Sequence, residues 1–281
     1  MRIKNHRLFL DEKTQARFVP TNNKGETIEP KYLIMHYTAT PTAESAVNWF
    51  KNPKSKASAH IVISRDGDVT QLVPFNLKAW HAGQSEWNNL IGMNNYSIGI
   101  ELENAGKLMS HSENQWRAWF GGMYHQDEVI EAIHKYDDEP AGWHMFTKDQ
   151  LAAAVEVALT IVDHYGIVEV LGHDDIAPTR KVDPGPAFPM MSFRSKVLGR
   201  ADDSSRLFET TADLNIRSGP GLDYDTLADL SPLKEGTRVE ILNSFEIWKF
   251  VQVVNHPKKT EARGWVHGSI CRSWILYISD W

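Results

Sequence analysis

The chain has 281 residues, 42% of them hydrophobic, and its 36 acidic and 30 basic side chains give a formal net charge of -6. A chain of this length can bury a sizeable core, in one large domain or in a medium domain followed by a small one. The acidic balance gives no global attraction to polyanions, so nucleic acid is not an expected partner. No apolar run approaches the roughly 20 residues that span a bilayer, so we expect no integral membrane segment.

The first predicted elements follow one another closely along the chain. Residues 1–30 are polar and aperiodic, and the apolar run KYLIMHYT then predicts a core strand that ends near His36. TPTAESAVNWFKNP predicts a short helix, because Thr42 can cap it and Pro53 stops it. AHIVISRDGDVTQLVP predicts a hairpin that turns at Asp66 and Gly67, and YSIGIELEN predicts another strand.

A long helix is predicted after residue 147. Thr147 and Gln150 form a capping box, and one helical stripe follows: Leu151, Ala154, Val155, Ala158, Ile161, Val162 and Tyr165. Such a helix should cover a sheet. Residues 105–146 are too long for a plain connection and are partly helical by pattern, so we expect an insertion or lid near a binding site.

The character of the sequence changes near residues 200–205. The stretch RADDSSR is polar, and the short strand-like runs that follow it are separated by Gly, Pro and Asp. This spacing predicts a small all-β barrel from about residue 206 to the end. Cys271 lies in this part, cannot form an internal disulfide, and is expected to be a small buried apolar residue.

Histidine and aspartate side chains suited to metal binding accompany a proline-rich segment, GHDDIAPTRKVDPGPAF (residues 172–188). A catalytic zinc site needs three nitrogen or oxygen ligands and one open position for water. His36 ends the first predicted strand, and His173 and Asp183 bracket the segment. Only a loop fixed by its prolines would bring these last two together, so the spacing by itself gives no more than a hypothesis.

Four blocks of sequence resemble a known enzyme family: LIMHYTAT, SAHIVISRDGDVTQLVPFNLKAWHAG, SIGIELEN and GHDDIAPTRKVDPGPAF. Their order and approximate spacing are similar to those of the zinc-dependent N-acetylmuramoyl-L-alanine amidases of the amidase 2 type, which includes AmpD and the peptidoglycan recognition proteins. The resemblance covers residues 30–198 apart from 105–146, which is longer than the family pattern. It implies an α/β (α+β) fold, with a central mixed β-sheet flanked by helices, in a domain of residues 1–200.

The resemblance also implies roles for individual residues. The ligands of Zn2+ would be His36, His173 and Asp183. The catalytic acidic residue would be Glu101, and a catalytic lysine would be Lys181. Strand parity puts Glu101 and Glu103 on one face, so the residues alone do not choose between them, and the resemblance favours Glu101.

The implied reaction is hydrolysis of the amide between the lactyl group of N-acetylmuramic acid and L-alanine, in peptidoglycan or muropeptides. Zinc would supply an activated water and polarise the scissile carbonyl. Glu101 would carry a proton from the water to the departing amine, and Lys181 would stabilise the developing oxyanion. The alternative for Lys181 is a surface ion pair with the neighbouring anionic ligand.

Six further residues occupy motif positions that border the groove in similar proteins. They are the weaker candidates for contacts with the sugar, the lactyl group or a peptide carboxylate: Tyr37, Lys56, His60, Trp80, His81 and Arg180. Packing is the alternative role for Trp80, and a structural role is the alternative for His60.

The C-terminal segment resembles a bacterial SH3-type domain, on the motif LNIRSGPG and the later RGWVHGSI. This resemblance implies an SH3-like barrel of residues 206–281 that binds the cell wall. Four aromatic residues either line a peptide groove there or, as is more usual in so small a barrel, form its core: Phe245, Trp248, Trp265 and Tyr277.

The leading hypothesis is therefore a zinc amidase whose partner is peptidoglycan or a muropeptide. The first residues, MRIKNHRLFLDEKTQ, lack the apolar core of a secretory signal, so we expect a cytoplasmic protein, with non-classical release to the cell wall as the alternative. Two competing hypotheses are a non-catalytic peptidoglycan-binding protein and a cytoplasmic interaction protein whose barrel binds proline-rich partners.

Overall fold

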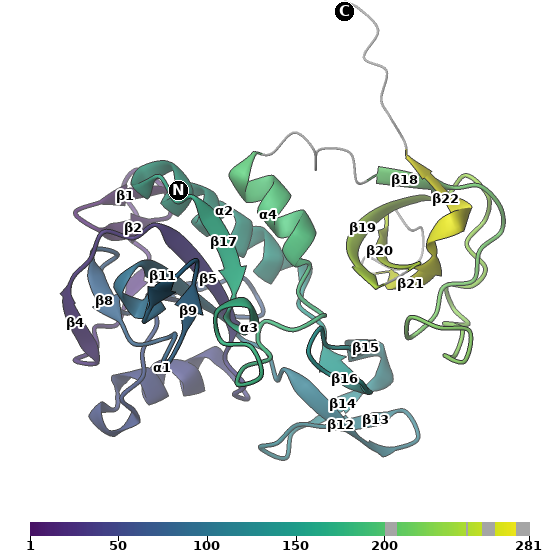
Figure 1. Cartoon of the computed structure of the whole chain (residues 1–281), viewed down its shortest axis with the longest axis horizontal. Coiled ribbons are helices and arrows are strands. Elements are labelled where there is room, and N and C mark those ends of the chain that lie inside the picture. The colour runs from purple at the N-terminus through teal and green to yellow at the C-terminus, as the bar shows by residue number, and fades with distance from the viewer. Residues whose placement is uncertain (200–206, 246, 255–261, 274–281) are drawn as a thin grey trace, which may run out of the picture. The chain divides into compact units, whose positions relative to one another are not determined.

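The computed structural model divides the chain into two compact units (Figure 1). It describes residues 1–199, 207–245, 247–254 and 262–273. The first unit comprises Met1–Val129 and Ile133–Phe188, and the second comprises Ile130–Ala132 and Pro189–Trp281. The predicted domain boundary near residues 200–205 lies outside the described residues.

A six-stranded mixed sheet forms the centre of the first unit, with the strand order β17-β5-β11-β6-β7-β3. In that order the strands are Glu169–Gly172, Tyr32–Tyr37, Ser97–Leu102, Ile61–Ile63, Val69–Gln71 and Arg17–Phe18. The first four run parallel, β6 and β7 form an antiparallel hairpin, and β3 joins β7 in parallel. The predicted central mixed sheet is confirmed, and its hairpin turns at the predicted Asp66 and Gly67.

Helix α1 (Ala43–Lys51) begins and ends where the sequence predicts. The hydroxyl of Thr42 accepts a hydrogen bond from the backbone N–H of Ser45, and Asn52, directly before Pro53, ends the helix. Its buried side chains belong to the same apolar cluster as Val62 of β6. Helix α1 therefore packs on the face of the sheet to which Val62 points.

Helix α2 (Lys148–Tyr165) covers the other face of the sheet (Figure 1). Half of the predicted capping box is confirmed, because the Thr147 hydroxyl accepts from the N–H of Gln150 at 3.2 Å, but the side-chain oxygen of Gln150 makes no return bond within the described residues. The buried positions are Gln150, Ala154, Val157, Ala158 and Ile161. The buried stripe therefore shares Ala154, Ala158 and Ile161 with the predicted one but includes Gln150 and Val157 in place of its other members. The reason is that the amide of Gln150 turns inward and donates to two backbone carbonyls at the end of the sheet.

The segment 105–146 is a five-stranded sheet, with the strand order β14-β13-β12-β16-β15, so the prediction of partial helix is wrong (Figure 1). In chain order its strands are β12 (Lys107–Ser112), β13 (Gln115–Arg117), β14 (Met123–His125), β15 (Val129–Ile133) and β16 (Pro140–His144). The single 3-10 turn η3 (Gln126–Glu128) precedes β15. Burial alternates in the short strand β13, where Trp116 is buried between the exposed Gln115 and Arg117, whereas β12 has one buried residue and β16 ends in three consecutive ones. The strands therefore share no period of two that would stand out in the sequence.

The remaining elements of the first unit are short. Three two-stranded sheets pair β1 (Arg2–Lys4) with β2 (Arg7–Phe9), β4 (Lys24–Thr27) with β8 (Leu77–Ala79), and β9 (Glu86–Trp87) with β10 (Leu90–Ile91). The single turns are η1 (Pro53–Ser55), η2 (Met93–Asn95) and α3 (His173–Ile176). Three of these strands, β1, β2 and β4, fall within the aperiodic first 30 residues.

The second unit contains helix α4 (Met190–Leu198) and an antiparallel sheet of five strands with the order β21-β20-β19-β18-β22. In chain order these are Leu207–Thr210, Arg238–Phe245, Trp248–Val253, Arg263–His267 and Cys271–Ser273, with the turn η5 (Gly268–Ile270) before the last. The motif LNIRSGPG makes only isolated bridges, at Leu214 and Arg217. The predicted all-β character holds for the described residues from 207 onward, which follow α4 and contain strands and the single turn η5.

The aromatic residues of the second unit lie mainly in its core. Trp248 and Trp265 are 8% and 1% exposed, whereas Phe245 is half-buried. Tyr277 lies outside the described residues. Cys271 is a free thiol packed at the edge of the apolar cluster, and it is half-buried rather than fully buried.

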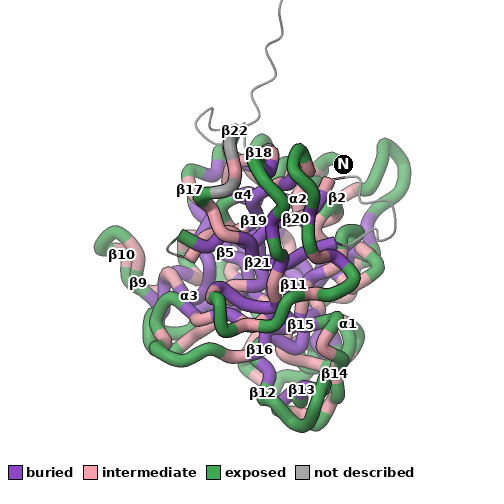
Figure 2. Tube along the Cα trace, turned by 90° about the vertical axis from the view of Figure 1, so that its right-hand side faces the viewer, coloured by how far each residue is buried: buried purple, intermediate pink, exposed green. Residues whose placement is uncertain are grey.

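Buried residues concentrate along the central strands, while the β9–β10 hairpin is largely exposed (Figure 2). Among the described residues, no helix combines the length and the apolar character that crossing a bilayer requires.

Candidate functional site

Three donor atoms converge at one edge of the central sheet. His36 lies near the carboxyl end of β5, and His173 follows directly after β17, the parallel neighbour of β5. Asp183 comes from the loop after α3. The Nδ1 atoms of His36 and His173 lie 3.0 Å apart, and Asp183 Oδ2 is 2.9 Å from each of them. All three residues are buried, and they are a group that could hold one metal ion.

The proline-rich loop is closed by its own backbone. The N–H of Asp174 donates to the carbonyl oxygen of Asp183 at 2.8 Å, so the residue after His173 is fastened to the third donor. At Gly172 a Cβ atom would lie 2.2 Å from the Asp174 carboxylate and 2.9 Å from Pro184. Glycine is therefore needed where the strand enters the loop.

A chain of hydrogen bonds fixes the tautomer of His36. The hydroxyl of Ser97 donates to the Met93 carbonyl at 2.6 Å, so its oxygen accepts from His81 Nε2 at 3.3 Å. His81 Nδ1 is then unprotonated and accepts from His36 Nε2 at 3.0 Å. Consequently the neutral ring of His36 turns the lone pair of Nδ1 toward His173 and Asp183.

The tautomer of His173 follows from one contact. Its Nε2 lies 3.1 Å from the carbonyl oxygen of Ala82, which can only accept, so Nε2 carries the hydrogen. The lone pair of Nδ1 therefore faces the other two donor atoms. The same carbonyl accepts from Arg180 Nη2 at 2.8 Å, which holds the 82–84 segment in place.

Two imidazole lone pairs and a carboxylate facing one another need a cation between them. Burial, followed by the nearby His173, lowers the pKa of His36 to about 4, so at neutral pH the ring is uncharged. Burial alone would raise the pKa of Asp183, but the two histidines hold it below its ordinary value. A tetrahedral zinc ion with bonds of about 2.0–2.1 Å separates its ligand atoms by about 3.3 Å. The donor set and its spacing fit such an ion.

A buried carboxyl group lies beside these donors. Glu101 of β11 is paired in register with His36 of β5 and is 8% exposed. Among the described residues its Oε2 has no hydrogen-bond partner. Burial, and then the charge of Asp183, raise the pKa of Glu101 well above its ordinary value, while the charge of Lys181 opposes the shift. Glu101 is thus a group that can hold a proton next to the donor atoms.

Glu103 differs from Glu101 in its surroundings. It lies just past the end of β11 and is half-buried. Its Oε2 accepts a long hydrogen bond, 3.4 Å, from the backbone N–H of Arg65. Glu103 is therefore a hydrogen-bonded neighbour at the end of the strand.

The two further histidines with predicted substrate contacts lie behind the donors. His81 is 8% exposed and its ring is used in the bonds to His36 and Ser97. His60 is fully buried, donates from Nε2 to the Leu77 carbonyl at 2.9 Å and accepts at Nδ1 from the N–H of Gly99. These placements favour a supporting role for both residues.

The other four predicted contact residues lie nearer the surface. Tyr37 is half-buried at the end of β5 and packs against Gly106, where a Cβ would lie 2.3 Å from its ring. Lys56 is exposed in a left-handed conformation after η1, and Trp80 is half-buried. The exposed Arg180 donates to the carbonyls of Ala82 and Gln84.

Arg180 also borders an open groove of about 960 Å³. One wall of the groove is the 83–92 segment, and the other is formed by residues of α3 and the turn after it. The groove therefore begins directly beside the Ala82 carbonyl that orients His173.

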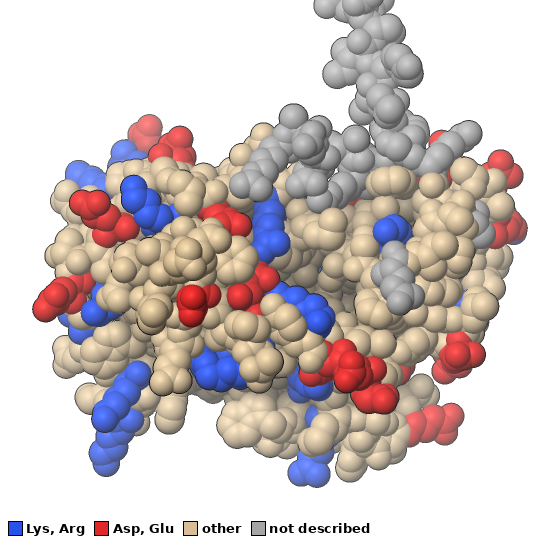
Figure 3. Space-filling model, in the orientation of Figure 1, with Lys and Arg blue, Asp and Glu red and all other residues tan. Residues whose placement is uncertain are grey.

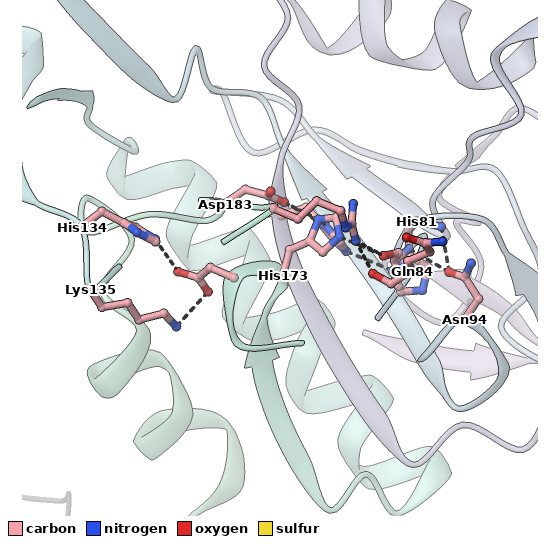
Figure 4. Close-up of polar contacts among 11 residues, drawn as sticks. His81, Gln84, Asn94, His134, Lys135, His173 and Asp183 are labelled. Atoms are coloured by element: carbon pink, nitrogen blue, oxygen red, sulfur yellow. Dashed lines mark hydrogen bonds and ion pairs between the residues drawn. The ribbon is translucent and has the colours of Figure 1, made fainter. Parts of the chain in front are cut away.

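Several positioning residues had no clear signal in the sequence (Figure 4). Asn94 Oδ1 accepts from the N–H groups of both His81 and Ala82, at 3.0 and 2.8 Å. The buried Asp174 accepts from His134 Nε2 at 3.0 Å and pairs with Lys135 Nζ at 3.1 Å. In the sequence, Asp174 stands out only as part of the acidic pair that follows His173. No periodicity connects it with His134.

Comparison with known proteins gives concordant results. The family model described as N-acetylmuramoyl-L-alanine amidase (Amidase_2) matches residues 26–186. The chain is 31% identical over 201 residues to the 1,6-anhydro-N-acetylmuramyl-L-alanine amidase AmpD of Escherichia coli K12, with coverage of 64% of this chain and 90% of AmpD. It is 32% identical over 226 residues to the N-acetylmuramoyl-L-alanine amidase AmiD of the same organism, with coverage of 73% and 70%.

Solved structures include similar chains. The crystal structure of a selenomethionine AmpD derivative has a TM-score of 0.49 and 26% sequence identity, over 70% of this chain and 99% of that chain.

Proposed function

Because the chain belongs to the N-acetylmuramoyl-L-alanine amidase (Amidase_2) family, we propose that its three convergent donors hold a zinc ion and that Glu101 and Lys181 complete the catalytic machinery. The protein is a hydrolase of the amide between the muramic acid lactyl group and L-alanine in peptidoglycan or muropeptides. The observation that carries the zinc proposal is the pair of fixed tautomers, which turn both Nδ1 lone pairs toward Asp183 Oδ2.

Bound zinc supplies Lewis-acid polarisation of the scissile carbonyl and an activated water nucleophile. Glu101 accepts the proton of the attacking water and delivers it to the departing amine of L-alanine. Burial and the charge of Asp183 raise its pKa above the ordinary value of a glutamate, which favours a carboxyl group that can hold the proton between these two steps. The buried, unpartnered Oε2 is the atom that we assign to this transfer.

The position of Lys181 supports the proposed oxyanion role. It is half-buried in the loop between His173 and Asp183, and its charge acts on both Glu101 and His36. A positive charge at this point stabilises the negative oxygen that develops as water adds to the carbonyl. The charge of Lys181 also opposes the rise in the Glu101 pKa.

We assign the stem peptide to the groove beside Arg180. The Arg180 guanidinium is exposed at the border of the groove and donates to two backbone carbonyls. None of the contacts given above pairs it with a carboxylate. A peptide carboxylate can accept from such a group. Tyr37, Trp80 and Lys56 are proposed to contact the sugar and lactyl group from the β5 and β8 side.

We propose that residues 206–281 form a bacterial SH3-type barrel that binds the cell wall. Its five antiparallel strands and continuous apolar core support this assignment. Basic and acidic side chains are mixed on the face of the molecule that Figure 3 shows. We therefore do not expect that face to bind a ligand through a large patch of one charge. We propose a cytoplasmic location, with non-classical release to the wall as the alternative.

The test is incubation of the full-length, zinc-loaded protein with soluble anhydro-muropeptides and with intact sacculi, followed by mass spectrometry of the products. Release of free stem peptide that begins with L-alanine, with one zinc per chain, is the expected result. Binding of muropeptides without cleavage in the presence of stoichiometric metal would instead support the non-catalytic peptidoglycan-binding alternative.

A further inference from the structure

The five-stranded sheet of residues 107–144, here called the insertion sheet, is fastened beside the donor site at two places. On one side, His134 Nε2 donates to Asp174, the residue after His173, and Lys135 pairs with the same carboxylate. On the other side, the indole N–H of Trp119 donates to the carbonyl of Ala39 at 2.8 Å. Ala39 follows β5, the strand that carries His36.

The turn that carries Trp119 is itself rigid. The N–H of Ala118 donates to the carbonyl of Gly122, and the N–H of Gly121 donates back to Ala118. The ring of Phe120 lies on Gly122, where a Cβ would be 2.6 Å from it, and packs against the apolar cluster of the insertion sheet. Since Phe120 turns inward, Trp119 is held outward.

Trp119 is fixed in orientation yet remains exposed. Its side chain is 72% exposed, although its one polar atom already has a partner. What it offers to solvent is therefore the uncharged surface of the indole ring. A ring held in this way loses little conformational entropy when a ligand covers it.

The position of Trp119 is within reach of the reaction. Ala39 is three residues beyond His36, so their Cα atoms are at most about 11 Å apart. A glycan that extends from the scissile amide covers such a distance. The groove beside Arg180 lies against the segment that follows Ala82, not beside Ala39. The Trp119 ring and this groove can therefore contact different parts of one substrate.

We propose that Trp119 is a sugar-binding platform, on which a pyranose ring of the muropeptide glycan stacks. A pyranose has an apolar face of C–H groups, and the electron-rich face of an indole attracts such groups. The stem peptide is the less suitable occupant, because its carboxylates and amines favour charged partners over a neutral ring. This inference rests on the proposed function, since the ligand is the sugar part of that substrate.

The experiment compares Trp119→Ala, Trp119→Phe and, as a matched control, Trp49→Ala on the exposed face of α1, where the tryptophan is 53% exposed. Two probes are titrated into the metal-free full-length protein: a disaccharide muropeptide, and the same stem peptide with an N-acetyl group in place of the sugars. The steady-state KM and kcat of the zinc-loaded proteins are measured with the first probe.

Trp119→Ala should raise the Kd and KM for the disaccharide muropeptide about tenfold and leave kcat within about twofold. It should leave the Kd for the sugar-free peptide unchanged, Trp119→Phe should lose less, and Trp49→Ala should match the parent. An unchanged KM in Trp119→Ala, or an equal loss for the sugar-free peptide, overturns the platform while leaving the amidase assignment intact. If the zinc-loaded parent itself fails to cleave, the proposed function fails, and this inference with it.

Discussion

Replacement of His81 by leucine tests whether the hydrogen-bond chain behind His36 controls metal binding. His81 Nδ1 accepts from His36 Nε2 at 3.0 Å, and His36 is 1% exposed. The variant His81→Leu leaves this N–H buried without its acceptor, which costs about 1–3 kcal/mol. Partners that orient a metal ligand contribute about 10–100-fold to metal affinity, or about 1.4–2.8 kcal/mol, so the two magnitudes agree.

The assay is competition for zinc between the protein and a chelator of known affinity. We expect His81→Leu to bind zinc 10–100-fold more weakly than the parent. The variant His81→Gln, whose amide oxygen can accept the same N–H, should recover part of the loss. The control is His144→Leu, because His144 is equally buried and its Nδ1 accepts from the Ala105 N–H, away from the donors. Parental affinity in His81→Leu, or an equal loss in His144→Leu, would refute the reasoning.

Three further predictions concern the proton carrier, the pH dependence of stability and metal linkage. Glu101→Gln should keep zinc but lose about 10²–10⁴-fold in kcat, whereas Glu103→Gln should stay within a fewfold of the parent; comparable losses in both would contradict the assignment. Burial, and then the charge of Arg65, lower the pKa of His144 to about 3 from its ordinary 6.5. Below pH 6.5 the unfolded chain therefore binds more protons, and the free energy of unfolding should fall by about 1.4 kcal/mol per pH unit between about pH 6.5 and 3. Denaturant titrations at a series of pH values should show that the free energy of unfolding of His144→Gln falls less steeply with decreasing pH, by about 1.4 kcal/mol per pH unit. The same pH dependence in parent and variant would falsify this explanation. Zinc at a hundred times its Kd should add about 2.7 kcal/mol to the free energy of unfolding of the parent, and a shift in Tm that persists in Asp183→Ala would show that the ion binds elsewhere.

The parts of the fold that could be predicted from the sequence are those with local signals. Thr42 and Thr147 cap helices because their hydroxyls accept from N–H groups three residues later, a relation visible in a short window. The hairpin at Asp66 and Gly67 is likewise local. The insertion sheet has no such local signal, because its strands share no pattern of burial: β13 buries only Trp116, whereas β16 ends in three consecutive buried residues.

The candidate site follows the same rule. His36, His173 and Asp183 were found through motif resemblance, and their convergence required the pairing of β5 with β17, which no local pattern specifies. The roles of Ser97 and His81 depend on one hydrogen bond after another across separate strands. Such a chain of donors and acceptors becomes visible only in three dimensions.

The central claim is that one zinc ion is bound by His36 Nδ1, His173 Nδ1 and Asp183 Oδ2. Anomalous diffraction at the zinc absorption edge, from crystals of the zinc-loaded protein, tests it most directly. We predict a single strong peak per protein chain, about 2.0–2.2 Å from each of these three atoms. A peak at another place, or an ion bound through the Nε2 atom of either histidine, would contradict the account.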